Sequence, residues 1–88
     1  MLNSTTLKRH ADLVDRMAAT LGLDLEEAVQ SGQLRVDSLS DAVLACTGCS
    51  NPDGCDRWLE MQNGRAPEAP GLCRNVRLFE DLKAGRRV

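Results

Sequence analysis

Aromatic side chains are scarce in this 88-residue chain, which has one Trp, one Phe and no Tyr. The hydrophobic core must therefore come mainly from Leu, Val, Ala and Met side chains. A domain of this size often needs a further staple beyond its hydrophobic core. The four cysteines are the obvious candidates, so we expect a metal site, a disulfide or oligomerisation to contribute to stability.

Long apolar runs and an excess of basic residues are also lacking. No apolar stretch approaches the about 18 residues of a membrane-spanning helix, and the first ten residues lack the apolar segment of a signal peptide. The formal charge of -2 and the pI near 5.3 disfavour general binding to nucleic-acid phosphates. We therefore expect a cytoplasmic protein that binds neither membranes nor nucleic acids. In that compartment clustered cysteines hold metal more often than they form disulfides.

The sequence also lacks the common catalytic motifs, among them the P-loop, GxGxxG, GxSxG and HExxH patterns. Neighbouring carboxylates such as Glu26 and Glu27 are adjacent along a predicted helix, so they do not converge on one point. His10 is the only histidine and lies on a charge-rich segment far upstream of the cysteines. We expect it at the surface rather than on a metal. No catalytic residue is assigned, and we expect a protein that is not an enzyme.

The first half of the chain shows helical periodicity. Apolar residues that recur at steps of three or four begin just after Ser4, and they are Leu7, Ala11, Val14, Ala18 and Leu21. This pattern predicts one amphipathic helix that ends at Gly22. The same seam, residues 7–21, could pair with a second chain in a homodimer. It covers only two heptads, whereas coiled coils need about three or more, so packing within its own domain is favoured.

Capping patterns mark the helices that follow. Asp24 with Glu27 resembles a capping box for a short helix over 25–31, and Ser38 with Asp41 predicts the start of a third helix that carries Cys46 near its end. Asn51, as N-cap before Pro52, starts a fourth helix that runs to about residue 63.

Residues 65–71 contain two prolines and a glycine, which indicates a linker loop. A last helix is predicted from residues 73–75 to Gly85, and the tail of residues 86–88 is predicted to fray. No segment alternates with a period of two. The sequence therefore predicts a single all-α domain over residues 1–88, with four or five short helices around a four-cysteine region at residues 46–73.

The cysteines follow the spacing C-x2-C-x5-C-x17-C, and they are Cys46, Cys49, Cys55 and Cys73. Thiolates are soft ligands, which select zinc or an iron-sulfur cluster. Structural zinc usually takes two CxxC-like pairs, and the second pair is missing here. A [4Fe-4S] cluster is wider than a zinc ion and accepts more dispersed ligands. We therefore favour [4Fe-4S], with Zn²⁺, [2Fe-2S] and disulfides or free thiols as alternatives.

The predicted helices suggest how the surroundings would act on these sulfurs. Gly48 would ease the turn between the first two cysteines, and Cys55 and Cys73 would lie in the first turns of helices, where the dipole favours a thiolate. Cys46 would lie at a helix C-terminus, where only metal charge offsets the unfavourable dipole.

Four further side chains are candidates for the surroundings of the cluster, namely Trp58, Leu59, Arg74 and Phe79. The two aromatic rings and the leucine would limit solvent access, and the arginine would donate hydrogen bonds to cluster sulfides. The alternatives are ordinary core packing for the apolar three and a solvated position for Arg74.

The run from Cys46 to Cys55, which enters a helix at its last cysteine, is similar to the ligand spacing of WhiB-like regulators and of endonuclease III-like DNA glycosylases. Both families are all-helical around a [4Fe-4S] cluster, which is what this resemblance implies here. Their remaining cysteine lies upstream, whereas here it is the downstream Cys73. Their DNA functions are not carried over, because neither the glycosylase's catalytic residues nor the WhiB-like basic tail can be placed on this chain.

A second resemblance covers nearly the whole chain. The chain resembles a family of small four-cysteine bacterial proteins of unknown function in several motifs. In the first half these are Met17 with Leu21, Gly22 and Ala28, and then Asp41-Ala42-Val43-Leu44 before Cys-x-Gly-Cys. In the second half they are Cys55-x-x-Trp58-Leu59, then Pro70-Gly71-x-Cys73-Arg74-Asn75, and finally Leu78-Phe79. The family supplies a layout without an activity. The resemblance implies that the four cysteines act together.

Two functional hypotheses follow. The first is a small iron-sulfur protein that acts in electron transfer or redox sensing with an unidentified protein partner. The alternative is a zinc-stabilised protein-interaction module without redox activity. Catalysis by a reactive thiol ranks third, because the sequence shows no base beside a cysteine.

Overall fold

The computed structural model describes residues 4–48, 51–62, 64–71 and 73–88. Within them the chain forms five helices and no strand, namely α1 (Ser4–Thr20), α2 (Leu25–Gln30), α3 (Val36–Thr47), α4 (Pro52–Glu60) and α5 (Val76–Lys83). The prediction of an all-α fold with four or five short helices is confirmed. Residues 61–75 connect α4 to α5, and the described residues of this segment are not helical.

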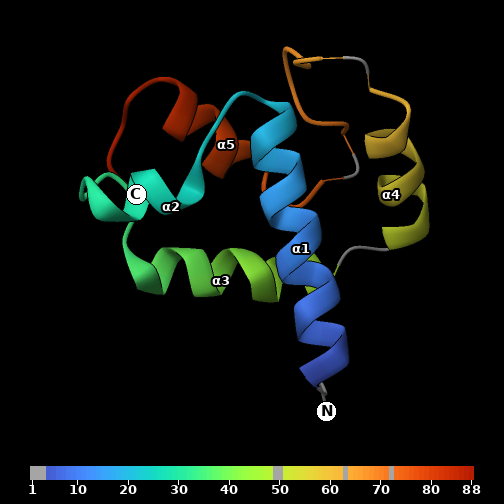
Figure 1. Cartoon of the computed structure of the whole chain (residues 1–88). Coiled ribbons are helices and arrows are strands. Elements are labelled where there is room, and N and C mark those ends of the chain that lie inside the picture. The colour runs from blue at the N-terminus through green and yellow to red at the C-terminus, as the bar shows by residue number, and fades with distance from the viewer. Residues whose placement is uncertain (1–3, 49–50, 63, 72) are drawn as a thin grey trace.

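Helix α1 is the element that the others pack around. It crosses α3, while α4 lies on its other side (Figure 1). Its buried apolar residues, Leu13, Val14, Met17 and Ala18, form one stripe that Leu21 continues just after the helix. Packing within its own domain is therefore confirmed for most of the predicted seam. Leu7 and Ala11, at the N-terminal end of the seam, lie outside this core, and a homodimer through residues 7–21 stays a prediction.

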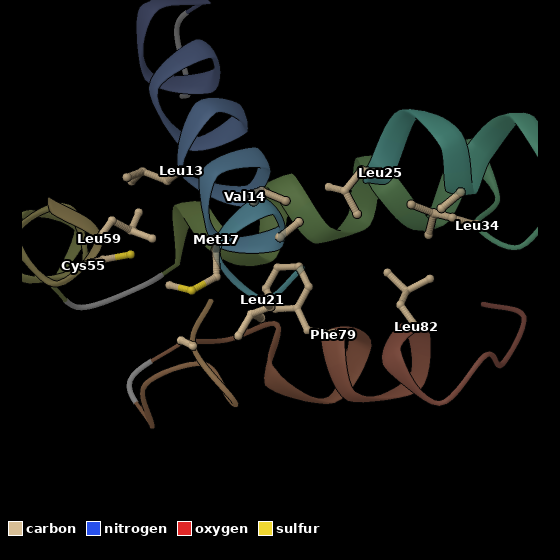
Figure 2. Close-up of a cluster of buried hydrophobic side chains, with 13 residues drawn as sticks. Leu13, Val14, Met17, Leu21, Leu25, Leu34, Cys55, Leu59, Phe79 and Leu82 are labelled. Carbon is tan, nitrogen blue, oxygen red and sulfur yellow. The ribbon is translucent and has the colours of Figure 1, made fainter. Parts of the chain in front are cut away.

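Both sides of α1 are filled by helices from the second half of the chain. Figure 2 shows Cys55 and Leu59 of α4 facing one side of α1, and Phe79 of α5 lying beside Leu21. Phe79 is 2% exposed, which makes it one of the most deeply buried side chains. One of the two aromatic side chains thus lies deep in the core beside Leu21.

Several helix ends follow the predicted signals. The Asp24 side chain accepts a hydrogen bond from the Glu27 backbone N–H at 3.1 Å and so caps α2. Gly22 closes α1 with a positive φ of 83°, while the Leu23 N–H bonds back to the Ala18 carbonyl at 2.8 Å. This arrangement is a Schellman motif, in which glycine adopts the left-handed conformation at no steric cost.

Three helix boundaries differ from the predictions. Helix α3 begins at Val36, not after Ser38, because the Leu39 N–H already bonds to the Arg35 carbonyl at 3.0 Å. Helix α4 ends at Glu60, before the predicted end at residue 63, which lies outside the described residues. Helix α5 begins at Val76, so Cys73 precedes this helix and does not lie in its first turn.

The tail of residues 86–88 is held in place, which corrects the expectation that it frays. The Val88 N–H donates to the Gln33 carbonyl at 2.8 Å, and the Val88 carbonyl accepts from the Arg35 N–H at 2.9 Å. The Val88 side chain also packs against the core. The C-terminus consequently lies beside α2 (Figure 1), and these backbone bonds anchor the loop that leads into α3.

Within the described residues, none of the helices combines the length and the apolar character that a membrane crossing requires.

Candidate metal centre

Cys46 lies in the last turn of α3, as the sequence predicts. It is half-buried and packs against the hydrophobic core. The helix ends at Gly48, whose φ of -85° is open to any residue, so the glycine is not needed here for a left-handed turn. A Cβ on Gly48 would come to 3.3 Å from the Ala45 carbonyl oxygen, which is a tight contact, and to 3.5 Å from Arg74 Nε, which is an ordinary van der Waals distance.

His10 contacts Cys46, and this contact corrects the expectation that the imidazole lies at the surface. The side chain is 6% exposed, and its Nδ1 lies 3.3 Å from Cys46 Sγ. The contact joins α1 to the C-terminal turn of α3. It places a hydrogen-bonding and metal-binding nitrogen beside one of the four candidate ligands.

Two hydrogen bonds hold the Cys73 segment against α3. Arg74 Nε donates to the Gly48 carbonyl at 2.9 Å, and Asn75 Nδ2 donates to the Ala42 carbonyl at 2.9 Å. Asn75 is 7% exposed, so its bond is shielded from water. Because these residues directly follow Cys73, they fix its backbone beside the helix that carries Cys46. Arg74 therefore bonds to a backbone carbonyl, and its predicted contact with cluster sulfides stays a prediction.

Cys55 lies in the first turns of α4, as predicted, and is 7% exposed. The N-cap Asn51 accepts from the Gly54 N–H at 2.9 Å, and the Cys55 N–H bonds to the Asn51 carbonyl at 3.1 Å. The positive end of the helix dipole thus favours a thiolate at this position. The side chain points toward α1, beside Leu59 (Figure 2).

Ion pairs fix α4 against α1. Arg16 Nη1 donates to Asp56 Oδ1 at 2.7 Å, and Arg9 pairs with Asp53 in the first turn of α4. The hydrogen bond to Asp56 raises the pKa of Arg16 above its ordinary value, while burial acts in the opposite direction. An arginine guanidinium is charged throughout the pH range in which proteins are ordinarily folded, with or without this shift. The pairs position the helix that carries Cys55.

The three apolar residues that are predicted to shield the cluster from water differ in how deeply they are buried. Leu59 and Phe79 belong to the hydrophobic core, and Trp58 is half-buried and packs against it. Core packing is therefore confirmed for these side chains. Their predicted effect on the solvent access of a cluster stays a prediction.

Three of the four predicted ligands can be placed. Cys46, Cys55 and Cys73 all belong to or pack against one hydrophobic cluster, whereas Cys49 lies outside the described residues. Among the side chains that the structure describes, no three from His, Cys, Asp and Glu form a group that could hold a metal ion. The structure therefore does not gather the three described cysteines into one metal-binding group, and they lie on segments that are joined by hydrogen bonds and packing.

Two residues of this site were not predicted from the sequence. His10 falls on the buried stripe of α1, three and four residues before Leu13 and Val14, so its helical position was a usable signal. Asn75 was noticed only within a family motif. Its bond to Ala42 joins residues 33 positions apart in the chain, and no local pattern carries that information.

Comparison with known proteins gives a family and nothing more specific. Neither the curated proteins nor the solved structures contain a match to this chain. One family model matches residues 1–85, which is almost the entire sequence and includes His10, the four cysteines and Asn75. The chain therefore belongs to DUF6455, a family of unknown function.

Proposed function

We propose that this protein is a small iron-sulfur protein, in which Cys46, Cys49, Cys55 and Cys73 hold a [4Fe-4S] cluster. We further propose that it acts in the cytoplasm, in electron transfer or redox sensing with a protein partner. The observation that carries the proposal is the link between Arg74 and Gly48. This hydrogen bond ties the residue after Cys73 to the turn between Cys46 and Cys49.

The donor set fits the proposed group. Thiolates are the ligands that iron-sulfur clusters require, and the three described cysteines lie on α3, on α4 and in the loop before α5, in or against one hydrophobic cluster. The Asn75 bond to Ala42 is a second, buried link between the Cys73 segment and α3. Both bonds join groups of the protein itself, and they hold the residues after Cys73 against α3 and its C-cap.

When bound, the cluster would supply a one-electron couple whose potential depends on hydrogen bonds to its sulfurs and on solvent exposure. The residues around it have separate roles in this proposal. With its Nδ1 protonated, His10 would donate a hydrogen bond to the Cys46 sulfur, the first turn of α4 would stabilise the Cys55 thiolate, and Trp58 would limit the access of water from the side of α4.

The first test is the metal and acid-labile sulfide content of protein purified without oxygen, together with its visible absorption spectrum. About four iron and four sulfide ions per chain, with a broad brown absorbance, would support the proposal. About one zinc per chain without colour would replace it with the zinc-stabilised interaction module. Protein with neither metal and with paired thiols would contradict both.

A reversible couple distinguishes the two redox roles. Electron transfer predicts repeated reduction and reoxidation without loss of iron, whereas sensing predicts rapid bleaching by oxygen followed by loss of structure. Cyclic voltammetry and circular dichroism on the same sample measure both outcomes.

A further inference from the structure

An open apolar groove runs between α1, α2 and α3, and none of the described residues that line it is a cysteine. Its larger part has a volume of about 630 Å³, and its apolar lining consists of Ala11, Val14, Leu25, Val29, Leu39 and Val43. A second recess of about 400 Å³ shares Ala11 and Val43 with the first and extends it along α1 and α3. We call the two together the α1–α3 groove.

The residues that the structure describes leave this groove uncovered. Ala11 is exposed, Leu39 and Val43 are half-buried, and Leu44 at the end of the groove is 53% exposed. Apolar side chains that stay exposed in a groove with polar borders are accessible to a binding partner. The groove runs between helices, a shape that suits an amphipathic helix laid along it.

The border of the larger part of the α1–α3 groove is acidic. Asp12, Asp15 and Glu26 line it, and none of its described lining residues is Lys or Arg. Asp12 lies 3.7 Å from the guanidinium of Arg16, but that group bonds more closely to Asp56, on the side of α4. Lys8 lines only the second recess. The groove therefore combines an apolar floor with a negative border.

We propose that the α1–α3 groove binds a basic amphipathic helix of a partner protein. The apolar face of that helix would cover Val43 and its neighbours, and its Lys or Arg side chains would meet Asp15 and Glu26. A second copy of this chain is a poorer occupant. A symmetric dimer through the groove would place the same carboxylates against each other, which is destabilising.

The test uses an 18-residue helical peptide of Leu and Lys, with Leu at every third or fourth position, added to the uniformly ¹⁵N-labelled full chain. A Leu/Glu peptide of the same pattern is the matched probe. The proposal predicts amide shift changes on α1, α2 and α3 around the groove with the Leu/Lys peptide, weaker binding at higher salt, and no binding of the Leu/Glu peptide at equal concentration.

Paired variants locate the binding site. Val43→Asp places a charge in the groove and should weaken binding by about tenfold or more, whereas Val36→Asp changes a residue of the same helix that is 63% exposed and lies outside the groove. Asp15→Lys combined with Glu26→Lys should also abolish binding, and Glu68→Lys, in an exposed part of the 61–75 segment, should leave it unchanged. Far-ultraviolet circular dichroism confirms that each variant is folded.

Three results would overturn the proposal. They are shift changes that map outside the groove, equal binding of the Leu/Lys and Leu/Glu peptides, and a concentration-dependent dimer of the free protein whose interface signals fall on the groove. None of these measurements depends on the metal content of the sample, so the outcome is independent of the iron-sulfur proposal.

Discussion

The imidazole of His10 is buried beside a predicted ligand, and a buried polar group of this kind is retained at a cost unless it is hydrogen-bonded. Its contact with Cys46 Sγ supplies that bond. A donor to a thiolate sulfur stabilises the more negative, reduced state of a cluster and raises its potential. His10→Leu should therefore lower the reduction potential. A difference of about 1 kcal/mol between the two redox states corresponds to roughly 40 mV for a one-electron couple.

The potential is measured by redox titration of the anaerobic protein followed by electron paramagnetic resonance. Lys8→Gln is the matched control, because it changes an exposed residue of the same helix. An iron-replete His10→Leu protein with an unchanged potential would remove His10 from the proposed centre and leave the four-cysteine proposal intact.

Cys73 is the ligand most distant in sequence from the other three, so it closes the longest loop of the proposed centre. Cys73→Ala should abolish stable iron binding, because a cluster with three protein ligands is more easily lost. The variant should also melt at a lower temperature, since metal binding contributes to the folding free energy of small domains. Differential scanning calorimetry measures the change against the iron-replete protein.

Metal-free wild-type protein is the control for this variant. If the centre accounts for the loss of stability, the variant and the metal-free protein should melt at nearly the same temperature. A variant with the same melting temperature as the iron-replete protein would contradict a structural role of Cys73 in any metal site.

At the scale of elements, the segment that joins α4 to α5 depends on two bonds of different character. The Asn75 amide is buried against the Ala42 carbonyl, whereas Arg74 is exposed. Asn75→Ala should lower the free energy of unfolding by about 1–2 kcal/mol even without metal. Arg74→Ala should change it by less than about 0.5 kcal/mol, as for most exposed residues.

Both variants should nevertheless lose the proposed cluster faster than the wild type, because both loosen Cys73 relative to α3. Urea unfolding of the metal-free proteins measures stability, and the bleaching half-life in air measures cluster retention. Arg77→Ala, an exposed arginine within α5, is the control. If Arg74→Ala bleached at the wild-type rate, the link to Gly48 would not position the site.

Helix positions were predictable wherever a local pattern decides them. The apolar period of α1 and the caps at Asp24 and Asn51 are contacts among residues close in sequence, and the structure confirms them. The start of α3 was not predictable, because its N-cap Arg35 makes no side-chain cap bond and is held by the Val88 carbonyl instead. The same distant bond explains why the tail does not fray.

In the candidate site, too, local patterns predicted some positions and could not predict others. The positions of Cys46 near the end of α3 and of Cys55 at the start of α4 followed from the helix pattern. The loop position of Cys73 and the bonds from Arg74 and Asn75 depend on how α5 packs against the rest of the chain. The residues next to His10 in sequence are mostly charged, and they led to the prediction that it is exposed. Its burial depends instead on the face of the helix on which it lies.

At the scale of the whole molecule, the proposed centre and the proposed docking groove share two helices. His10 and Ala11 are neighbours on α1, but the first contacts Cys46 and the second lines the groove. On α3, Val43 in the groove lies one turn before Cys46. A partner helix bound in the groove would therefore lie close to Cys46. This proximity is what electron transfer, or transmission of a change at the centre, requires of a partner site.

Removal of the metal should loosen the molecule unevenly. Helix α4 contributes two buried residues, Cys55 and Leu59, and its ion pairs to α1 are partly exposed, where such pairs contribute only about 0–1 kcal/mol each. By contrast, α2 and α5 are held by buried side chains and by the bonds of the C-terminal tail.

Without the metal, amide hydrogen exchange should accelerate in α4 and in the 61–75 segment by at least about tenfold, the equivalent of about 1.4 kcal/mol. Amides of α2 and α5 should change much less. Uniform acceleration along the chain, or none in α4, would show that the metal does not connect α4 and Cys73 to α3.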